Sequence, residues 1–150
     1  MRYLLDTNII IGYSRKGRIS TLLEEDYFLL SGEHRLYVST VTLGELDSFI
    51  KRNNIGVRKQ AYMNQVLEQC YQIDISQTEI IVRYGDIDAF SQGKLKVEGH
   101  DFTSRNMGKN DLWIAATASH FGLTLLTTDK DFHHLDKAYL DLSYIEVSQS

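Results

Sequence analysis

The sequence of 150 residues contains no proline, one cysteine and no apolar run near the ~20 residues that span a bilayer. The lone cysteine, Cys70, cannot form a disulfide within the chain, and no Cys-x-x-Cys or His-x-x-x-His spacing indicates a zinc site. No basic region followed by an apolar stretch opens the chain, so we expect no export signal. These absences predict a cytoplasmic protein with no membrane contact.

Positive charge is also scarce. The chain has 16 lysines and arginines against 20 acidic residues, which gives a formal net charge of −4. Nucleic-acid binding depends on basic side chains, so this balance taken alone argues against such a partner. Two divalent cations bound in one acidic pocket would cancel that charge. The net charge therefore neither supports nor excludes a nucleic-acid partner.

The residues that are present suit one globular domain. The hydrophobic share is 43% and the charged share 24%, both ordinary for a folded protein. This length supports one core and is short for two domains, and we find no repeat, linker or low-complexity segment. We predict a single domain over residues 1–150.

Short apolar runs alternate with helical patterns along the chain. We expect strands at residues 3–5, 36–39, 71–75, 123–126 and 143–147. We expect helices after Asn8, within 19–30 up to Gly32, at 42–52, around 63–70, after a Ser76/Glu79 capping box, at 111–121 and at 129–134. The glycine-bearing segment 91–110 is expected to be irregular, and such segments are usually functional or mobile. Strands separated by helices predict an α/β fold with a mostly parallel sheet.

Four acidic residues occupy positions that this fold brings together. Asp6 ends the first strand and Asp129 follows the strand 123–126, while Glu45 and Asp111 each lie in the first turn of an expected helix. In right-handed β-α-β units, strand C-termini and helix N-termini share one edge of the sheet. All four carboxylates are therefore expected at one edge, provided that the strand 123–126 is parallel.

Such a cluster of carboxylates needs cations. Two carboxylates ~4 Å apart repel by about 4 kcal/mol at an effective dielectric constant of ~20. Carboxylate oxygens are hard ligands that favour Mg²⁺ or Mn²⁺ over zinc. Ions held in this way orient phosphates and activate water, so phosphodiester hydrolysis is the reaction that the pattern indicates.

Each acid taken alone also has a structural explanation. Asp6 can cap the helix that follows it, and Thr42-x-x-Glu45 fits a capping box. Asp111 can favour the macrodipole of its helix, and Asp129 can cap a turn. The convergence of the acids on one edge is what favours the metal site.

Three segments resemble the PIN-domain nucleases, and most closely the VapC-type toxin ribonucleases of toxin–antitoxin pairs. They are LLDTNIIIGY near the start, VSTVTLGEL in the middle and NDLWIAATASHFGLTLLTTDKDF near the end. The resemblance implies a three-layer α/β/α sandwich with a mostly parallel five-stranded sheet. It also implies Mg²⁺ or Mn²⁺ dependence and endonuclease action on RNA.

The resemblance also assigns roles by position. Asp6, Glu45, Asp111 and Asp129 match the family's catalytic, metal-binding acids, with Asp131 as an alternative or supporting fourth acid, and Asn8 and Thr128 match polar residues that support the metal and its water. Our hypothesis is that the first three acids hold one ion. Asp129 then serves a second ion or the attacking water, and cleavage leaves a 5′ phosphate and a 3′ hydroxyl.

Partners follow from the resemblance and from the basic residues. We expect Arg105, Lys109, Arg15 and Lys16 to contact an RNA substrate, whether tRNA, rRNA or mRNA. A VapC-type protein implies a small cognate antitoxin and a homodimer. Apolar residues of the second helix, Tyr27, Phe28 and Leu29, are candidates for the antitoxin surface, although we expect most of them to pack in the core.

Other classes of protein remain as alternatives. A haloacid-dehalogenase-type phosphatase needs a second aspartate where this chain has Asn8, and a receiver domain needs a phosphorylatable aspartate and a lysine for which we find no counterpart. No G-x-G-x-x-G follows the first strand, which argues against a dinucleotide site. A noncatalytic module that binds RNA or protein stays open.

Overall fold

A computed structural model describes residues 1–147 and contains one parallel sheet. Its strands are β1 (Arg2–Leu5), β2 (Arg35–Ser39), β3 (Cys70–Ile73), β4 (Thr124–Thr127) and β5 (Asp141–Tyr144). Their order is β3-β2-β1-β4-β5, and every neighbouring pair is parallel. The α/β prediction is confirmed, including the parallel pairing of β4 on which the convergence of the acids depended.

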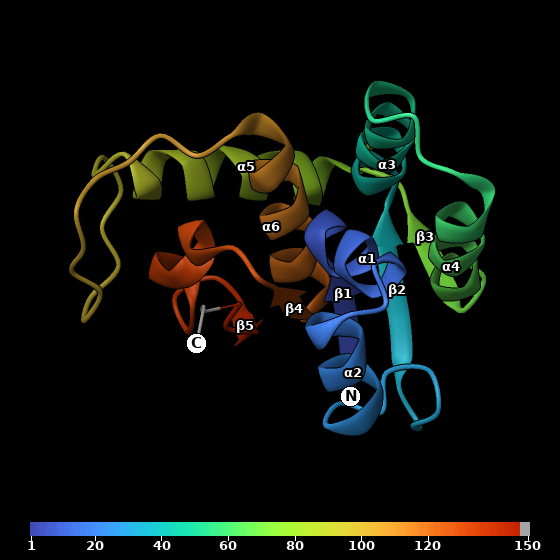
Figure 1. The fold of residues 1–150 in the computed structure, drawn as a ribbon. Coiled ribbons are helices and arrows are strands. Elements are labelled where there is room, and N and C mark those ends of the chain that lie inside the picture. Colours follow the sequence, from blue (N-terminus) through green and yellow to red (C-terminus); the bar gives the residue numbers. More distant parts are fainter. Residues whose placement is uncertain (148–150) are drawn as a thin grey trace.

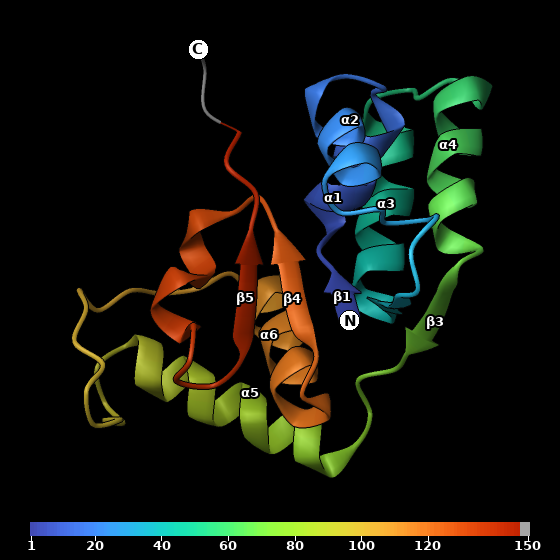
Figure 2. The same cartoon turned by 90° about the horizontal axis from the view of Figure 1, so that it is seen from below.

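Helices cover both faces of the sheet (Figures 1 and 2). One face carries α1 (Thr7–Ser14), α2 (Arg18–Glu25), α3 (Thr40–Arg52) and α4 (Val57–Leu67). The other carries α5 (Thr78–Ser91), α6 (Lys109–Phe121) and the 3₁₀ helix η1 (Lys130–Leu135). The three-layer α/β/α sandwich is therefore confirmed.

Side chains point alternately to the two faces of the sheet along each strand, so the protein has two hydrophobic cores. Tyr3 and Leu5 of β1 pack with α1 and its neighbours, whereas Leu4 points to the opposite face and packs with α5 and α6. Small residues such as Ala115 and Ala116 are completely buried in α6, which lets this helix lie close to the sheet. Within residues 1–147, no helix is long and apolar enough to cross a membrane.

The second helix is shorter than the sequence predicts. It ends at Glu25, and Phe28 beyond it adopts a left-handed conformation with φ of 51°. Gly32 is therefore not its C-terminal stop, and Tyr27, Phe28 and Leu29 lie in the turn that follows the helix. Their placement on the helix is therefore wrong. Phe28 is exposed, whereas Leu29 is buried and Tyr27 packs against the core, as expected for most of these residues.

Both predicted capping boxes are also wrong. Ser39 caps α3 because its Oγ accepts from the backbone N–H of Val41, so Thr42 lies inside the helix and Glu45 lies in its second turn. The helix α5 begins at Thr78 after Gln77, and no side chain caps it. The other strand and helix bounds differ from the predicted ones by a few residues, which is usual for element ends. Residues 92–108, between α5 and α6, are irregular as predicted.

Candidate active site

The carboxyl edge of the sheet holds a cleft of about 710 Å³ whose lining includes Asp6, Glu45 and Asp111. Asp6 lies directly after β1, Glu45 on α3 and Asp111 in the first turn of α6. These elements are far apart in the sequence. The predicted convergence of the three acids is confirmed.

Asp6 is 3% exposed, and both of its carboxylate oxygens accept hydrogen bonds. Oδ1 accepts from the backbone N–H of Thr7 at 2.8 Å, so Asp6 does cap α1. Oδ2 accepts from the hydroxyl of Thr127 at 2.7 Å. The same hydroxyl accepts from the backbone N–H of Asp129 at 2.9 Å. Thr127 therefore connects the first and fourth predicted acids.

A second threonine orients Glu45. The hydroxyl of Thr7 donates to Oε1 of Glu45 at 2.6 Å. The hydroxyl oxygen of Thr42 lies 3.1 Å from the hydroxyl oxygen of Thr7. Since Thr7 follows Asp6 in the chain, one turn of backbone fixes both carboxylates. Thr7 and Thr42 are buried polar residues, and each has a hydrogen-bond partner.

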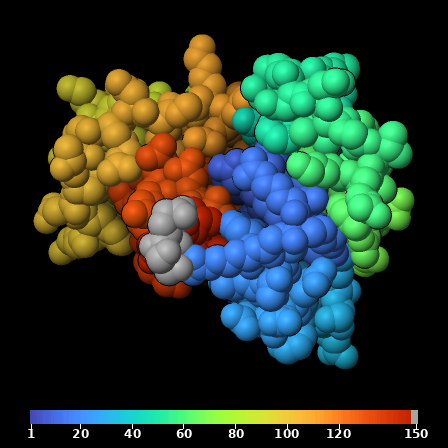
Figure 3. Space-filling model, in the orientation of Figure 1, coloured from blue at the N-terminus to red at the C-terminus, as the bar shows by residue number. Residues whose placement is uncertain are grey.

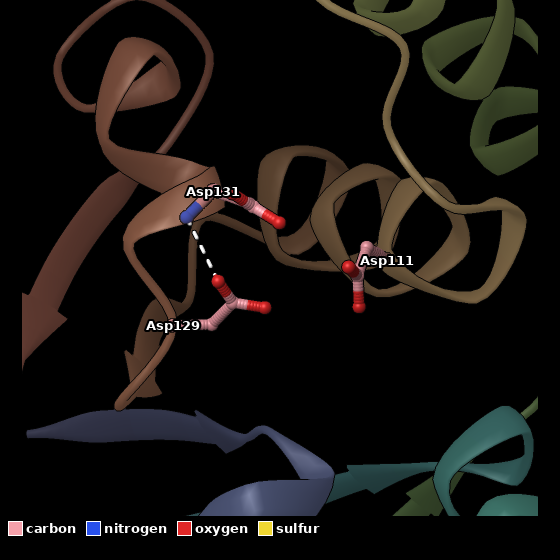
Figure 4. A group of neighbouring side chains, drawn as sticks. All are labelled: Asp111, Asp129 and Asp131. Carbon is pink, nitrogen blue, oxygen red and sulfur yellow. Dashed lines mark hydrogen bonds between the residues drawn. The ribbon is translucent and has the colours of Figure 1, made fainter.

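The carboxylates of Asp111, Asp129 and Asp131 point toward one another (Figure 4). One oxygen from each lies within 4.8 Å of the others. Asp129 is the N-cap of η1, and its Oδ1 accepts from the backbone N–H of Asp131 at 2.9 Å. Both candidates for the fourth acid thus lie beside Asp111.

Burial and mutual repulsion disfavour the charged forms of these acids. Burial is the main cause that raises the pKa of Asp6 to about 6, with Asp129 and Glu45 adding to it against the hydrogen bonds from Thr127 and Thr7. Burial also raises the pKa of Asp111 to about 7, followed by the charges of Asp6, Asp129, Glu45 and Asp131. Every other acid of the cluster thus contributes to the field at Asp111.

This arrangement fits a divalent cation. Mg²⁺ holds six oxygen ligands at about 2.1 Å, so neighbouring oxygens around one ion are about 3.0 Å apart and opposite ones about 4.2 Å apart. One oxygen from each of Asp111, Asp129 and Asp131 lies within 4.8 Å of the others, so small side-chain movements would bring all three onto one ion. The donors are all hard oxygens, and a cation would relieve the repulsion that raises the two pKa values.

Arginines surround the same cleft. Arg15 and Arg18 lie in and after the turn between α1 and α2, and Arg52 lies at the end of α3, and all three line the cleft with the acids. Figure 3 shows α1 and α2 at the surface between the C-terminal part of the chain and α3 with α4. Arg15, one of the expected RNA contacts, thus lines the same cleft as the acids.

Lys16 has a different environment. Its Nζ lies 3.6 Å from the ring centroid of Tyr13 and 4.4 Å from that of Tyr62, and it pairs with Glu24 at 3.5 Å. Lys16 has φ of 51°. It does not line the cleft, whereas its neighbour Arg15 does.

The other two expected RNA contacts line smaller hollows next to the acids. Lys109 shares a hollow of about 410 Å³ with Glu45, Asn110 and Asp111. Arg105 lines a cavity of about 280 Å³ together with Asp131. Each of these two basic residues thus shares a hollow with at least one acid of the cluster.

Of the predicted supporting residues, Asn8 and Thr128 both line the cleft. The hydroxyl that links the acids belongs instead to Thr127, and Thr7 joins Glu45, neither of which the sequence analysis selected. The signal was available for Thr127. Side chains alternate along β4, so only one of the two threonines can face Asp6 on the neighbouring strand.

The sequence matches the family described as PIN domain over residues 3–138. Among curated proteins, no sequence matches the chain.

Several solved structures share the fold. A chain of the VapBC2 structure from Rickettsia felis, bound to a DNA fragment from its promoter, superposes with a TM-score of 0.73 at 24% identity, covering 96% of this chain and 98% of that one. A chain of VapBC-1 from nontypeable Haemophilus influenzae gives 0.69 at 25% identity with the same coverage. The VapBC-5 toxin–antitoxin structure from Mycobacterium tuberculosis gives 0.65 at 21%, again covering 96% and 98%.

Proposed function

Because the chain belongs to the PIN domain family, we propose that it is a metal-dependent endoribonuclease and the toxin of a toxin–antitoxin pair. The observation that carries the proposal is the meeting of Asp6, Glu45 and Asp111 in one cleft, with Asp129 and Asp131 beside them. The similar structures, which are toxin–antitoxin complexes, support the toxin assignment.

The proposed cofactor is Mg²⁺ or Mn²⁺, held by Asp6, Glu45, Asp111 and Asp129, with Asp131 as a supporting acid. A bound cation of this kind neutralises charge on the scissile phosphate and lowers the pKa of water. The threonines Thr7 and Thr127 hold the carboxylates of Glu45 and Asp6 in place by donating hydrogen bonds to them.

The proposed reaction is hydrolysis of an RNA phosphodiester. The oxygen of a water molecule forms a bond to phosphorus in line with the bond to O3′, which breaks. The attacking water loses a proton to Asp129 if this residue serves the water rather than a second ion, and to solvent otherwise. A proton from solvent completes the 3′ hydroxyl. The products are a 5′ phosphate and a 3′ hydroxyl.

Arg15, Arg18 and Arg52 are proposed to hold the phosphates of the RNA strand as it enters the cleft, because they line it together with the acids. Arg105 and Lys109 would meet the strand in the smaller hollows next to the acids. A cognate antitoxin would block the same cleft, and it is the proposed partner of the free toxin. A symmetric homodimer is proposed from the family alone.

One assay tests the proposed activity. The protein is incubated with tRNA and rRNA in Mn²⁺, with and without EDTA, and the melting temperature is measured over a Mn²⁺ titration. We expect cleavage that EDTA abolishes. We also expect Mn²⁺ to raise the free energy of unfolding by RT ln(1 + [L]/Kd), which appears as a rise in melting temperature. A noncatalytic module would give neither cleavage nor a metal-dependent rise, and that outcome would refute the proposal.

The contrast between Arg15 and Lys16 gives a prediction for the RNA path. Replacing Arg15 with Ala should weaken RNA binding several-fold and reduce the slope of log affinity against log salt by about 0.7, the value for one phosphate on a single strand. Replacing Lys16 with Ala should leave that slope unchanged and lower the melting temperature, because its Nζ contacts Tyr13 and Tyr62. Fluorescence anisotropy at several salt concentrations measures the salt slope of each variant, and thermal unfolding measures the melting temperature. Equal loss of slope in the two variants would contradict the assignment.

A further inference from the structure

The segment before α6 forms one wall of the cavity of about 280 Å³ beside the acidic cluster. Thr103, Ser104, Arg105, Asn106 and Met107 line it from this segment, and Asp131 lines it from η1. Asp131 also contributes an oxygen to the group with Asp111 and Asp129. An occupant that contacts Asp131 would therefore be a direct neighbour of the proposed metal.

This wall is fixed to the rest of the protein. The backbone N–H of Arg105 donates to the carbonyl oxygen of Ser91, at the end of α5, at 2.8 Å. The buried hydroxyl of Ser91 lies 2.7 Å from Nε2 of His134 and 3.4 Å from Sδ of Met107. His134 belongs to η1, the element that carries Asp131. The two walls of the cavity are thus joined through one buried serine.

A glycine permits this approach of the segment to α5. Gly93 has φ of 79°, and a Cβ on it would lie 2.5 Å from Oγ of Ser104. A larger residue at position 93 would strain the backbone, because φ is positive, and would force the side chain of Ser104 to shift. The loop therefore has a defined position beside the acids rather than only a long path between two helices.

The side chains in the cavity offer donors and acceptors together. Nε of Arg105 is buried without a hydrogen-bond partner, and the guanidinium makes no ion pair among residues 1–147. Ser104 and Asn106 are exposed and can both donate and accept. Asp131 is a pure acceptor, and Met107 supplies an apolar surface. A phosphate presents only acceptors and would be repelled by Asp131, whereas the edge of a nucleobase presents both kinds of group.

We propose that this cavity, between residues 103–107 and Asp131, binds one unpaired base of single-stranded RNA next to the scissile phosphate and so sets the sequence preference of cleavage. The inference rests on the proposed nuclease function. Arg105 and Asn106 face the edge of the base, and the arginines of the larger cleft hold the backbone, which carries no sequence information.

Cleavage of an RNA pool with a randomised stretch tests this, with the product ends sequenced for the wild type, Asn106→Ala, Arg105→Lys and the control Asn64→Ala. Asn64 is exposed on α4, away from the cavity. We expect the wild type and the control to favour one base at one position beside the cut. Both cavity variants should reduce that preference by about tenfold and leave other positions unchanged. No base preference in the wild type, or the same preference in all four proteins, would overturn the proposal.

A binding measurement separates this proposal from the nuclease assignment. Affinities of four homopolymeric tetranucleotides are measured by anisotropy in Ca²⁺ for the same proteins. If the wild type does not cleave but binds one base at least tenfold better than the others, and Asn106→Ala removes that difference, the cavity assignment stands while the nuclease assignment fails. Equal affinities, or a uniform loss with a reduced salt slope in the variants, would indicate a backbone contact and refute the base pocket.

Discussion

Replacing Asp6 with Asn should abolish metal-dependent RNA cleavage, with a loss of at least a thousandfold in rate, and yet leave a folded protein. The carboxylate is central to the cleft, and its field acts on Asp111. Asparagine keeps an oxygen that can accept from the backbone N–H of Thr7 and so preserves the cap of α1. The neutral amide is a much poorer ligand for a divalent cation. Undiminished, EDTA-sensitive cleavage by this variant would exclude Asp6 from the site.

The same substitution should stabilise the metal-free protein. The pKa of Asp6 is about 6 in the folded state against an ordinary value of 3.8, so the folded state binds more protons between these two pH values. Stability of the wild type therefore falls as pH rises from about 4 to 6 and stays low above that range. Asparagine has no such dependence, but its amide can keep only one of the two hydrogen bonds that the carboxylate accepts from Thr7 and Thr127, which offsets about 1 kcal/mol. The raised pKa of Asp6 corresponds to about 3 kcal/mol at pH 7, so we expect a net gain of about 2 kcal/mol, or about 4–8 °C in melting temperature.

Calorimetry of the metal-free proteins at pH 4.5 and pH 7 checks the sign, because the advantage of the variant should shrink at the lower pH. Asp101→Asn is the matched control, since Asp101 is exposed in the segment before α6. It should change neither stability nor cleavage. Added Mn²⁺ should reverse the order of stability, since only the wild type retains the full set of acids. A variant less stable than the wild type at pH 7 without metal would contradict the electrostatic account.

The sequence predicted the placement of the acids well because that placement follows from topology. Asp6 and Asp129 follow parallel strands, and Asp111 opens a helix, so the handedness of the crossovers brings them to one edge. Neither the exact helix bounds nor the capping residues enter that argument. Glu45 lies in the second turn of α3 instead of the predicted first turn, and it still lines the cleft.

Features set by tertiary contacts were not predictable in the same way. The end of α2 depends on the left-handed turn at Phe28, and no glycine or asparagine at that position announces it. Lys16 shares a basic stretch with Arg15, but contacts with Tyr62 on the distant α4 take it out of the cleft. Such outcomes depend on which rings fold against which side chains, and sequence spacing does not encode that.

Substitutions of the neighbouring threonines Thr127 and Thr128 test which hydroxyl orients the carboxylates of the site. Replacing Thr127 with Val keeps the shape of the side chain but removes the hydroxyl that donates to Asp6 and accepts from the backbone of Asp129. A buried carboxylate oxygen and an N–H would then lack partners, which should cost about 2–4 kcal/mol. Loss of a residue that orients a metal ligand typically costs about 10–100-fold in affinity or activity, so Mn²⁺ binding and cleavage should both fall by this amount.

Thr128→Val is the comparison that separates orientation of the acids from general damage to the strand end. Thr128 is half-buried and lines the cleft beside the acids. Its replacement should cost less than about 1 kcal/mol, as surface changes usually do. Thr127→Ser, which restores the hydroxyl, should recover most of the Mn²⁺ affinity lost in Thr127→Val. Titration calorimetry with Mn²⁺ and thermal unfolding of the three variants measure this ranking. If Thr128→Val lowers Mn²⁺ affinity as much as Thr127→Val, or if serine fails to rescue it, the hydroxyl of Thr127 does not hold the acids in place.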